Sequence, residues 1–124
     1  MRIGIVDYGA GNILSVYNSI FNLGFDPEIV NDSNELNNFD KIIIPGVGSA
    51  FKALKTLEKK GFISSIKKFY NSGKPILGIC LGLQIFATQL FEDGVSNGFG
   101  IIDGNIELIN EPQKFNIGWC EVNI

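Results

Sequence analysis

Short apolar runs alternate along this chain with segments of helical periodicity, and this alternation restricts its fold more than any other feature. Such βα repeats place strands side by side in a parallel sheet with helices packed on its faces. The sequence therefore predicts an α/β, doubly wound, mostly parallel sheet with flanking helices. Beyond Gly94, two segments show a partial alternation of apolar and polar residues, which predicts additional antiparallel strands. The expected strands are 2–7, 28–30, 41–44, 76–79, 101–109 and 119–124, and the expected helices cover 13–21, 50–57 and 62–70.

The segment Gly78–Gln84 places a cysteine between a strand and a helix. The apolar run Pro75–Ile79 predicts a buried strand that leads straight into Cys80, and a helix-patterned segment follows at once. A nucleophile on so sharp a turn has a strained backbone, and side chains at Gly78 and Gly82 would collide. We therefore interpret Cys80 as a nucleophile on an elbow. The helix after it is expected to bury Leu83, Phe86, Ala87, Leu90 and Phe91.

The sequence contains no histidine. A thiol on such an elbow normally relies on an imidazole that takes its proton. The first turn of the following helix can stabilise the Cys80 thiolate, but the later proton transfers need a further group. The sequence thus contains one half of a catalytic apparatus.

Two glycine-containing loops follow other strands of the predicted sheet. Pro45–Gly48 leaves the neighbouring strand at the same C-terminal edge as the cysteine, where open α/β sheets bind ligands. A backbone N–H of Val47 or Gly48, together with that of Leu81, could form an oxyanion hole there. Tyr8–Asn12 lacks the third glycine of a dinucleotide fingerprint. It is interpreted as a tight turn whose final asparagine is the N-cap of the next helix.

Length and composition bound the remaining possibilities. The 124 residues predict one domain, 1–124, and 45% hydrophobic with 19% charged residues suffices for a packed core. A net charge of −3 without a large basic cluster argues against nucleic acid as a partner. No stretch approaches the roughly 18 apolar residues of a membrane span, and no signal peptide is recognisable, so we expect a cytoplasmic protein. Its two cysteines then remain thiols, and Cys120 is interpreted as a small, partly buried residue.

Four motifs taken together resemble one family. They are Asp7–Asn12, Pro45–Gly48, Gly78–Gln84 and Gly118–Trp119, and they occur in that family's order and at its spacing. The family is that of the glutaminase subunits of imidazole glycerol phosphate synthase, which are class I (triad-type) glutamine amidotransferases of histidine biosynthesis. The elbow alone indicates class I amidotransferases in general, and the first and last motifs narrow the resemblance to this subunit.

The resemblance implies a specific chemistry. Cys80 would attack the side-chain amide of glutamine, release ammonia and leave a glutamyl thioester. The ammonia would pass to a separate cyclase subunit of a heterodimer that makes imidazole glycerol phosphate. No cofactor and no metal ion are implied. The residues that match the family's motifs are Val47, Gly48 and Leu81 for the oxyanion hole, Gly46, Gly82 and Gln84 for substrate binding, and Asn12 and Trp119 for the partner interface. For Trp119 the alternative interpretation is a large residue of the hydrophobic core.

The sequence also departs from the family. Family members carry the catalytic His and its Glu partner beyond position 124, and Phe115, Asn116 and Cys120 differ from the usual residues around the Gly-Trp motif. Because the chain ends at Ile124 in mid-strand without a polar tail, we expect it to be truncated at the C-terminus. Three alternatives stay open: a paralogous amidotransferase for surface-sugar synthesis, an inactive relative that binds and regulates a partner synthase, and a thiol-dependent hydrolase or redox protein without histidine.

Overall fold

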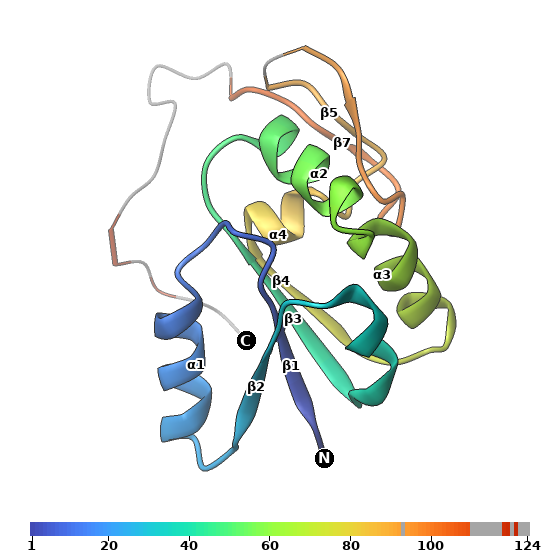
Figure 1. The fold of residues 1–124 in the computed structure, drawn as a ribbon. Helices are drawn as coiled ribbons and strands as arrows, with labels where there is room; N and C mark the ends of the chain where they lie inside the picture. The colour runs from blue at the N-terminus through green and yellow to red at the C-terminus, as the bar shows by residue number, and fades with distance from the viewer. Residues whose placement is uncertain (93, 110–117, 120, 122–124) are drawn as a thin grey trace.

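Four parallel strands form the main sheet, and three short strands lie beyond its C-terminal edge (Figure 1). The computed structural model describes residues 1–92, 94–109, 118, 119 and 121. The main unit contains, in chain order, β1 (Ile3–Val6), α1 (Ile13–Asn22), β2 (Pro27–Val30), the 3-10 helix η1 (Ser33–Asn38), β3 (Lys41–Gly46), α2 (Ala50–Lys59), α3 (Phe62–Asn71), β4 (Ile76–Cys80) and α4 (Leu81–Gln84). The short strands are β5 (Gln89–Leu90), β6 (Ser96–Asn97) and β7 (Asn105–Ile106).

The main sheet has the order β2-β1-β3-β4, and every neighbouring pair is parallel. Helices connect the strands in the manner of βα repeats, and Figure 1 shows α1 on one face of the sheet with α2 and α3 on the other. The predicted α/β, doubly wound fold is therefore confirmed. The C-terminal ends of β1, β3 and β4 meet at one edge, so the loops after them are brought together there.

The hydrophobic core lies between the sheet and the α2–α3 pair. The predicted helical periodicity is confirmed here except at Tyr70, which the pattern of 62–70 places on the apolar face but which is 45% exposed. The other residues of each apolar stripe face this core, and burial of each large side chain contributes about 1.5–3 kcal/mol. Tyr8, just after β1, is also fully buried in this cluster. The buried helix residues are Ala50, Ala53, Leu54 and Leu57 of α2 and Phe62, Ile66 and Phe69 of α3.

Helix α1 begins and ends as its sequence predicts. The Asn12 side chain accepts a hydrogen bond from the Ser15 N–H (3.2 Å), which satisfies one of the free donors of the first turn. Beyond the other end, Gly24 has a φ of +86°, a conformation in which glycine avoids a steric cost. None of the residues of α1 is fully buried, so its apolar stripe covers the sheet only in part.

The outer strand β4 is less buried than the apolar run Pro75–Ile79 suggests. Leu77 is 54% exposed and Ile79 is 37% exposed, so the expectation of a buried strand is wrong for the described structure. Both side chains line a shallow groove with Ile43 and with Val16 of α1. The physical reason is position: β4 lies at the end of the sheet, beyond the part that α1 covers.

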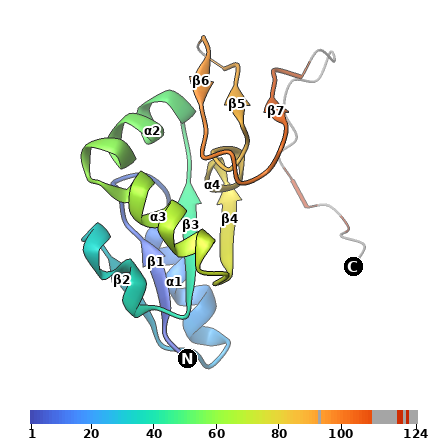
Figure 2. The ribbon, with the colours of Figure 1, turned by 90° about the vertical axis from the view of Figure 1, so that its right-hand side faces the viewer.

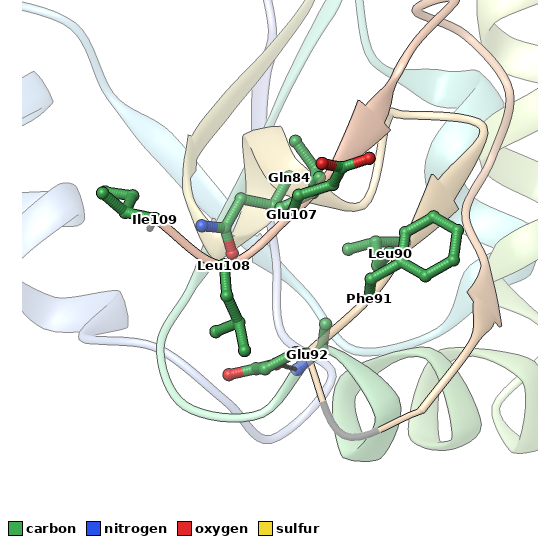
Figure 3. A pocket seen from close by; sticks show the side chains of 9 residues that line it. Gln84, Leu90, Phe91, Glu92, Glu107, Leu108 and Ile109 are labelled. Atoms are coloured by element: carbon green, nitrogen blue, oxygen red, sulfur yellow. Dashed lines mark hydrogen bonds between the residues drawn. The ribbon is translucent and has the colours of Figure 1, made fainter. Parts of the chain in front are cut away.

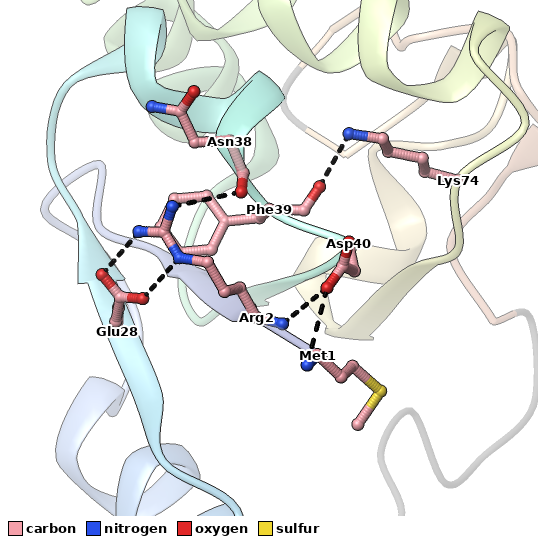
Figure 4. A network of polar contacts seen from close by, with 7 residues as sticks. All are labelled: Met1, Arg2, Glu28, Asn38, Phe39, Asp40 and Lys74. Atoms are coloured by element: carbon pink, nitrogen blue, oxygen red, sulfur yellow. Dashed lines mark hydrogen bonds and ion pairs between the residues drawn. The ribbon is translucent and has the colours of Figure 1, made fainter.

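A polar network ties the N-terminal end of the sheet together (Figure 4). The Arg2 guanidinium donates two hydrogen bonds of 2.9 Å to the Glu28 carboxylate and lies over the Phe39 ring. The Arg2 backbone N–H donates to Asp40, and the Lys74 ammonium donates to the Phe39 carbonyl. The network therefore fixes the edge opposite to that of Cys80.

The segment after α4 differs most from its prediction. The expected helix through 83–91 ends at Gln84, Leu83 is 50% exposed, and Gln89–Leu90 forms β5. β5 pairs antiparallel with β6 and parallel with β7, so 101–109 contributes one two-residue strand instead of a long hairpin strand. Figure 2 shows this small sheet standing beyond the ends of β3 and β4. The expected strand 119–124 lies mostly outside the described residues.

Within the described part of the chain, no helix is both long enough and apolar enough to cross a bilayer.

Candidate active site

Cys80 stands on a strained turn between β4 and α4. It has φ 55° and ψ −115°, and among the described residues it alone combines a positive φ with a side chain. Such a conformation costs about 1–3 kcal/mol and persists where the surrounding packing enforces it. The side chain is exposed. The structure therefore confirms the predicted elbow geometry and presents the thiol to solvent.

The two glycines around Cys80 are required by packing. A Cβ added to Gly82 would lie directly against the Ile44 carbonyl oxygen of β3. A Cβ at Gly78 would approach the Gly82 carbonyl oxygen at 2.6 Å. Both contacts are with backbone atoms, which cannot turn aside as a flexible side chain can. The elbow can therefore close only with glycine at both positions, as the sequence predicts.

The Pro45–Gly48 loop lies beside the elbow. β3 continues through Gly46, two residues further than the sequence indicates, because Gly46 still pairs in register with Cys80. A Cβ at Gly46 would lie 2.6 Å from the Tyr8 hydroxyl, so the loop passes close to buried groups. Val47 is exposed, and Gly48 has a φ of +88°. The loop thus leaves the sheet next to the thiol.

Leu81 is the first residue of α4, directly after the cysteine. Its side chain is buried, and its N–H is among the first donors of a helix, which have no partner within the helix. The elbow therefore brings one helical N–H and the backbone of the Val47 loop to the same strand edge.

Gln84 lines a cavity of about 180 Å³ together with acidic side chains (Figure 3). Glu92 and Glu107 contribute to its wall, and Glu92 also accepts a hydrogen bond of 2.9 Å from the Ala50 N–H at the start of α2. A carboxylate at this position stabilises the helix N-terminus. The cavity offers an amide and two carboxylates, a set that suits a small ligand bearing an amino group.

Three of the predicted site residues line two hollows at this edge, whereas Cys80, Gly46, Leu81 and Gly82 line neither of them. Val47 and Gly48 line a second hollow with Tyr8 and Lys52, separate from the one at Gln84. Ser49 borders the second hollow and Ala50 the first, so the start of α2 stands between them. The described structure therefore brings Val47 and Gly48 beside the elbow but does not place them in one cavity with Gln84.

The two predicted interface residues are on the surface. Asn12 is exposed where it caps α1, and the Trp119 side chain is fully exposed, so the interpretation of Trp119 as a core residue is wrong. Phe115, Asn116 and Cys120 lie outside the described residues.

Sequence reasoning missed Glu92 and the hydroxyl of Tyr8. The neighbouring sequence does not mark either residue as functional. Glu92 follows an apolar segment, as many surface carboxylates do, and Tyr8 lies in a segment that is interpreted as a turn. Both acquire their place through contacts distant in sequence, 42 residues in the case of Glu92 and Ala50. Among the described residues no three His, Cys, Asp or Glu side chains gather in a way that could hold a metal ion.

Tyr8 should make the fold sensitive to strong alkali. Burial, and then the negative charge of Cys80, raises the pKa of Tyr8 from 10.0 to about 12. Folding thus favours the protonated phenol, so this contribution to stability is complete below about pH 10 and is lost as the pH rises towards 12. Over that interval the wild-type chain should lose roughly 2–3 kcal/mol more unfolding free energy than Tyr8→Phe. Urea denaturation of both chains measures this difference, and an equal loss of unfolding free energy in the two chains would contradict the prediction.

Comparison with known proteins agrees with this geometry. Residues 4–122 match the family described as glutamine amidotransferase class-I. The chain is 40% identical over 123 residues to the imidazole glycerol phosphate synthase subunit HisH of Caldanaerobacter subterraneus subsp. tengcongensis, covering 98% of this chain and 61% of that one. It is 40% identical over 125 residues to HisH of Aquifex aeolicus, with 98% and 60% covered. The chain therefore spans about three-fifths of the length of these curated relatives.

Solved structures share the fold. A glutamine amidotransferase superposes with a TM-score of 0.63 at 20% identity, over 71% of this chain and 46% of that one. A protein of Thermoplasma acidophilum that is described as part of a GMP synthase superposes with a TM-score of 0.52 at 29% identity, over 68% and 42%. Together with the family match over nearly all of its residues, this shows that the chain belongs to the class-I glutamine amidotransferases.

Proposed function

We propose that this chain is part of the glutaminase subunit of an imidazole glycerol phosphate synthase. The observation that carries the proposal is the exposed, strained Cys80 between two glycines that packing requires. The support for the pathway is the 40% identity to the HisH subunits named above. The partner would be a cyclase subunit that receives ammonia, and the exposed Asn12 and Trp119 are its proposed contacts.

The proposed reaction is hydrolysis of glutamine to glutamate and ammonia. The Cys80 sulfur adds to the side-chain carbonyl carbon of glutamine, and the electron pair of the C=O bond moves to oxygen. The N–H groups of Val47 or Gly48 and of Leu81 are the proposed donors to that oxyanion. As the adduct collapses, the amide nitrogen takes up the proton that the thiol gave up, the C–N bond breaks and ammonia leaves. Water then cleaves the thioester, which yields glutamate and restores the thiol.

The proposed substrate cavity is the one at Gln84. Its wall carries Glu92 and Glu107, whose negative charge suits the α-amino group of glutamine, while the Gln84 amide can bond to either end of a zwitterion. Gln84 lies four residues after Cys80, about one helical turn. Cys80 does not line this cavity, so a ligand held there by its amino group would extend its side chain out of the cavity towards the sulfur.

A glutamine-like electrophile tests this proposal. A diazoketone or chloroketone analogue of glutamine should label Cys80, and free glutamine should protect the thiol from it. Glu92→Gln should weaken that protection at least about tenfold, because a charged hydrogen bond to the ligand is lost. Mass spectrometry after labelling at a series of glutamine concentrations measures the effect.

The matched control is Glu58→Gln, which removes a carboxylate from the exposed side of α2 and should leave protection unchanged. Labelling that glutamine does not slow, in a chain whose thiol still reacts with iodoacetamide, would contradict the proposed substrate.

A further inference from the structure

The hydroxyl of Tyr8 is the most unusual polar group in the described structure. The side chain has 0% exposure and belongs to the hydrophobic core, yet its oxygen has no hydrogen-bond partner among the described residues. Leaving a buried hydroxyl unpaired is unfavourable. Phenylalanine would fill the same space without that cost, so packing alone does not account for the oxygen.

The position of this hydroxyl relates it to the elbow. A Cβ built on Gly46 would lie 2.6 Å from the Tyr8 oxygen and 2.9 Å from the Gly82 nitrogen. Gly46 is the register partner of Cys80 on the neighbouring strand. The hydroxyl therefore lies among the backbone groups that support the cysteine, between the loop after β3 and the first turn of α4.

The electrostatics agree with that position. The raised pKa of Tyr8, about 12, has burial as its main cause and the negative charge of Cys80 as the second. The phenol consequently keeps its proton at neutral pH. In a poorly polarisable environment a neutral O–H that is bonded to nothing else can turn towards a nearby charge at little cost.

We propose that the Tyr8 hydroxyl is a hydrogen-bond donor for the negative charge that forms at Cys80. The proposal rests on the proposed role of Cys80 as the nucleophile. In the described structure the Cys80 sulfur is not a hydrogen-bond partner of this hydroxyl, so the bond requires the two side chains to move towards each other. When the thiol loses its proton to a base, the Cys80 side chain rotates towards the hydroxyl, and the O–H donates to the sulfur without transferring its own proton. It thus lowers the free energy of the reactive form of the enzyme.

Alkylation kinetics test this inference without requiring glutamine turnover. In a Cys120→Ser background, where Cys80 is the remaining thiol of the sequence, the rate of reaction with iodoacetamide is measured from about pH 5 to 10. Tyr8→Phe should move the half-maximal rate upward by about one pH unit, so that the rate near neutrality falls by up to about tenfold. The other ionisable groups at this edge, Asp7, Lys52 and Glu92, are the same in both chains.

Tyr70→Phe is the matched control, because it removes a hydroxyl from a half-exposed tyrosine of α3 and should leave the profile unchanged. Tyr8→Phe should also melt at the wild-type temperature or above, since it removes an unpaired buried group. A folded Tyr8→Phe chain with the wild-type alkylation profile would overturn the inference.

A second measurement does not depend on that variant. The ring carbon that bears the hydroxyl of Tyr8, followed by NMR, should shift as Cys80 ionises, and the shift should disappear in Cys80→Ser. A signal that does not respond to ionisation of the thiol would also overturn the inference. Neither result concerns glutamine binding, so the outcome is separate from that of the labelling test above.

Discussion

Gly82→Ala will destabilise the fold by at least about 3 kcal/mol, which is a large part of the stability of a domain of this size. The added methyl group would lie directly against the Ile44 carbonyl oxygen, in a central strand of the sheet. Relief requires that either β3 or the start of α4 moves, and each movement breaks the elbow that carries Cys80. Urea denaturation followed by circular dichroism measures the loss, and the alkylation rate of Cys80 reports whether the elbow persists.

Gly118→Ala is the control for the same chemical change. A Cβ at Gly118 meets nothing within 4 Å, so its effect should stay within about 0.5 kcal/mol. If Gly82→Ala unfolded at the wild-type urea concentration, the close packing described for the elbow would be wrong.

The parts of the fold that follow from local pattern were predictable. The four parallel strands arise from short apolar runs, and α2 and α3 arise from apolar stripes that repeat with the helical period. The elbow was predictable for a different reason. Its constraint is steric and lies within five residues. Gly78 and Gly82 approach each other and β3 so closely that only glycine fits at both positions, and this pair of glycines is visible in the sequence.

The end of α4 was not predictable from periodicity. The apolar residues after Gln84 fit a helix, but their backbone groups bond to a later segment. The Ile85 carbonyl accepts the Phe99 N–H (2.7 Å) and the Phe86 carbonyl accepts the Ile101 N–H (2.9 Å). A helix would need those carbonyls for its own next turn. Contacts from distant residues therefore override the local pattern, and they also create the small sheet and the position of Glu92.

The exposure of β4 has a related cause. Its apolar residues predict burial on both faces, but burial depends on what packs against the outer strand. Gly78 turns towards α4, whereas Leu77 and Ile79 face the side on which α1 covers only the neighbouring part of the sheet. The apolar residues of a strand show that its side chains tolerate burial. They do not show whether another helix or strand packs against them.

The 124-residue chain will show little or no glutaminase turnover, even where its thiol is labelled readily. The amide nitrogen must take up a proton so that it leaves as ammonia, and water must then be activated against the thioester. A positioned imidazole normally performs both transfers, with an effect of about 10²–10⁴-fold, and this sequence contains no histidine. Asp7 does not replace it, because its carboxylate accepts the Gly9 N–H (2.9 Å) within the turn after β1. Release of glutamate, with and without a cyclase subunit, measures turnover.

Added imidazole provides the control for this prediction. If the missing function is proton transfer, imidazole in solution should raise the rate of glutamate release by the wild-type chain and should have no effect on Cys80→Ala. Glu58→Gln should respond as the wild type does, because its change is on the exposed side of α2. Rapid turnover without imidazole, lost in Cys80→Ala, would mean that another group of this chain transfers the protons. Glu92 and Glu107, whose carboxylates line the Gln84 cavity, would then be the first candidates for that group and the first residues to substitute.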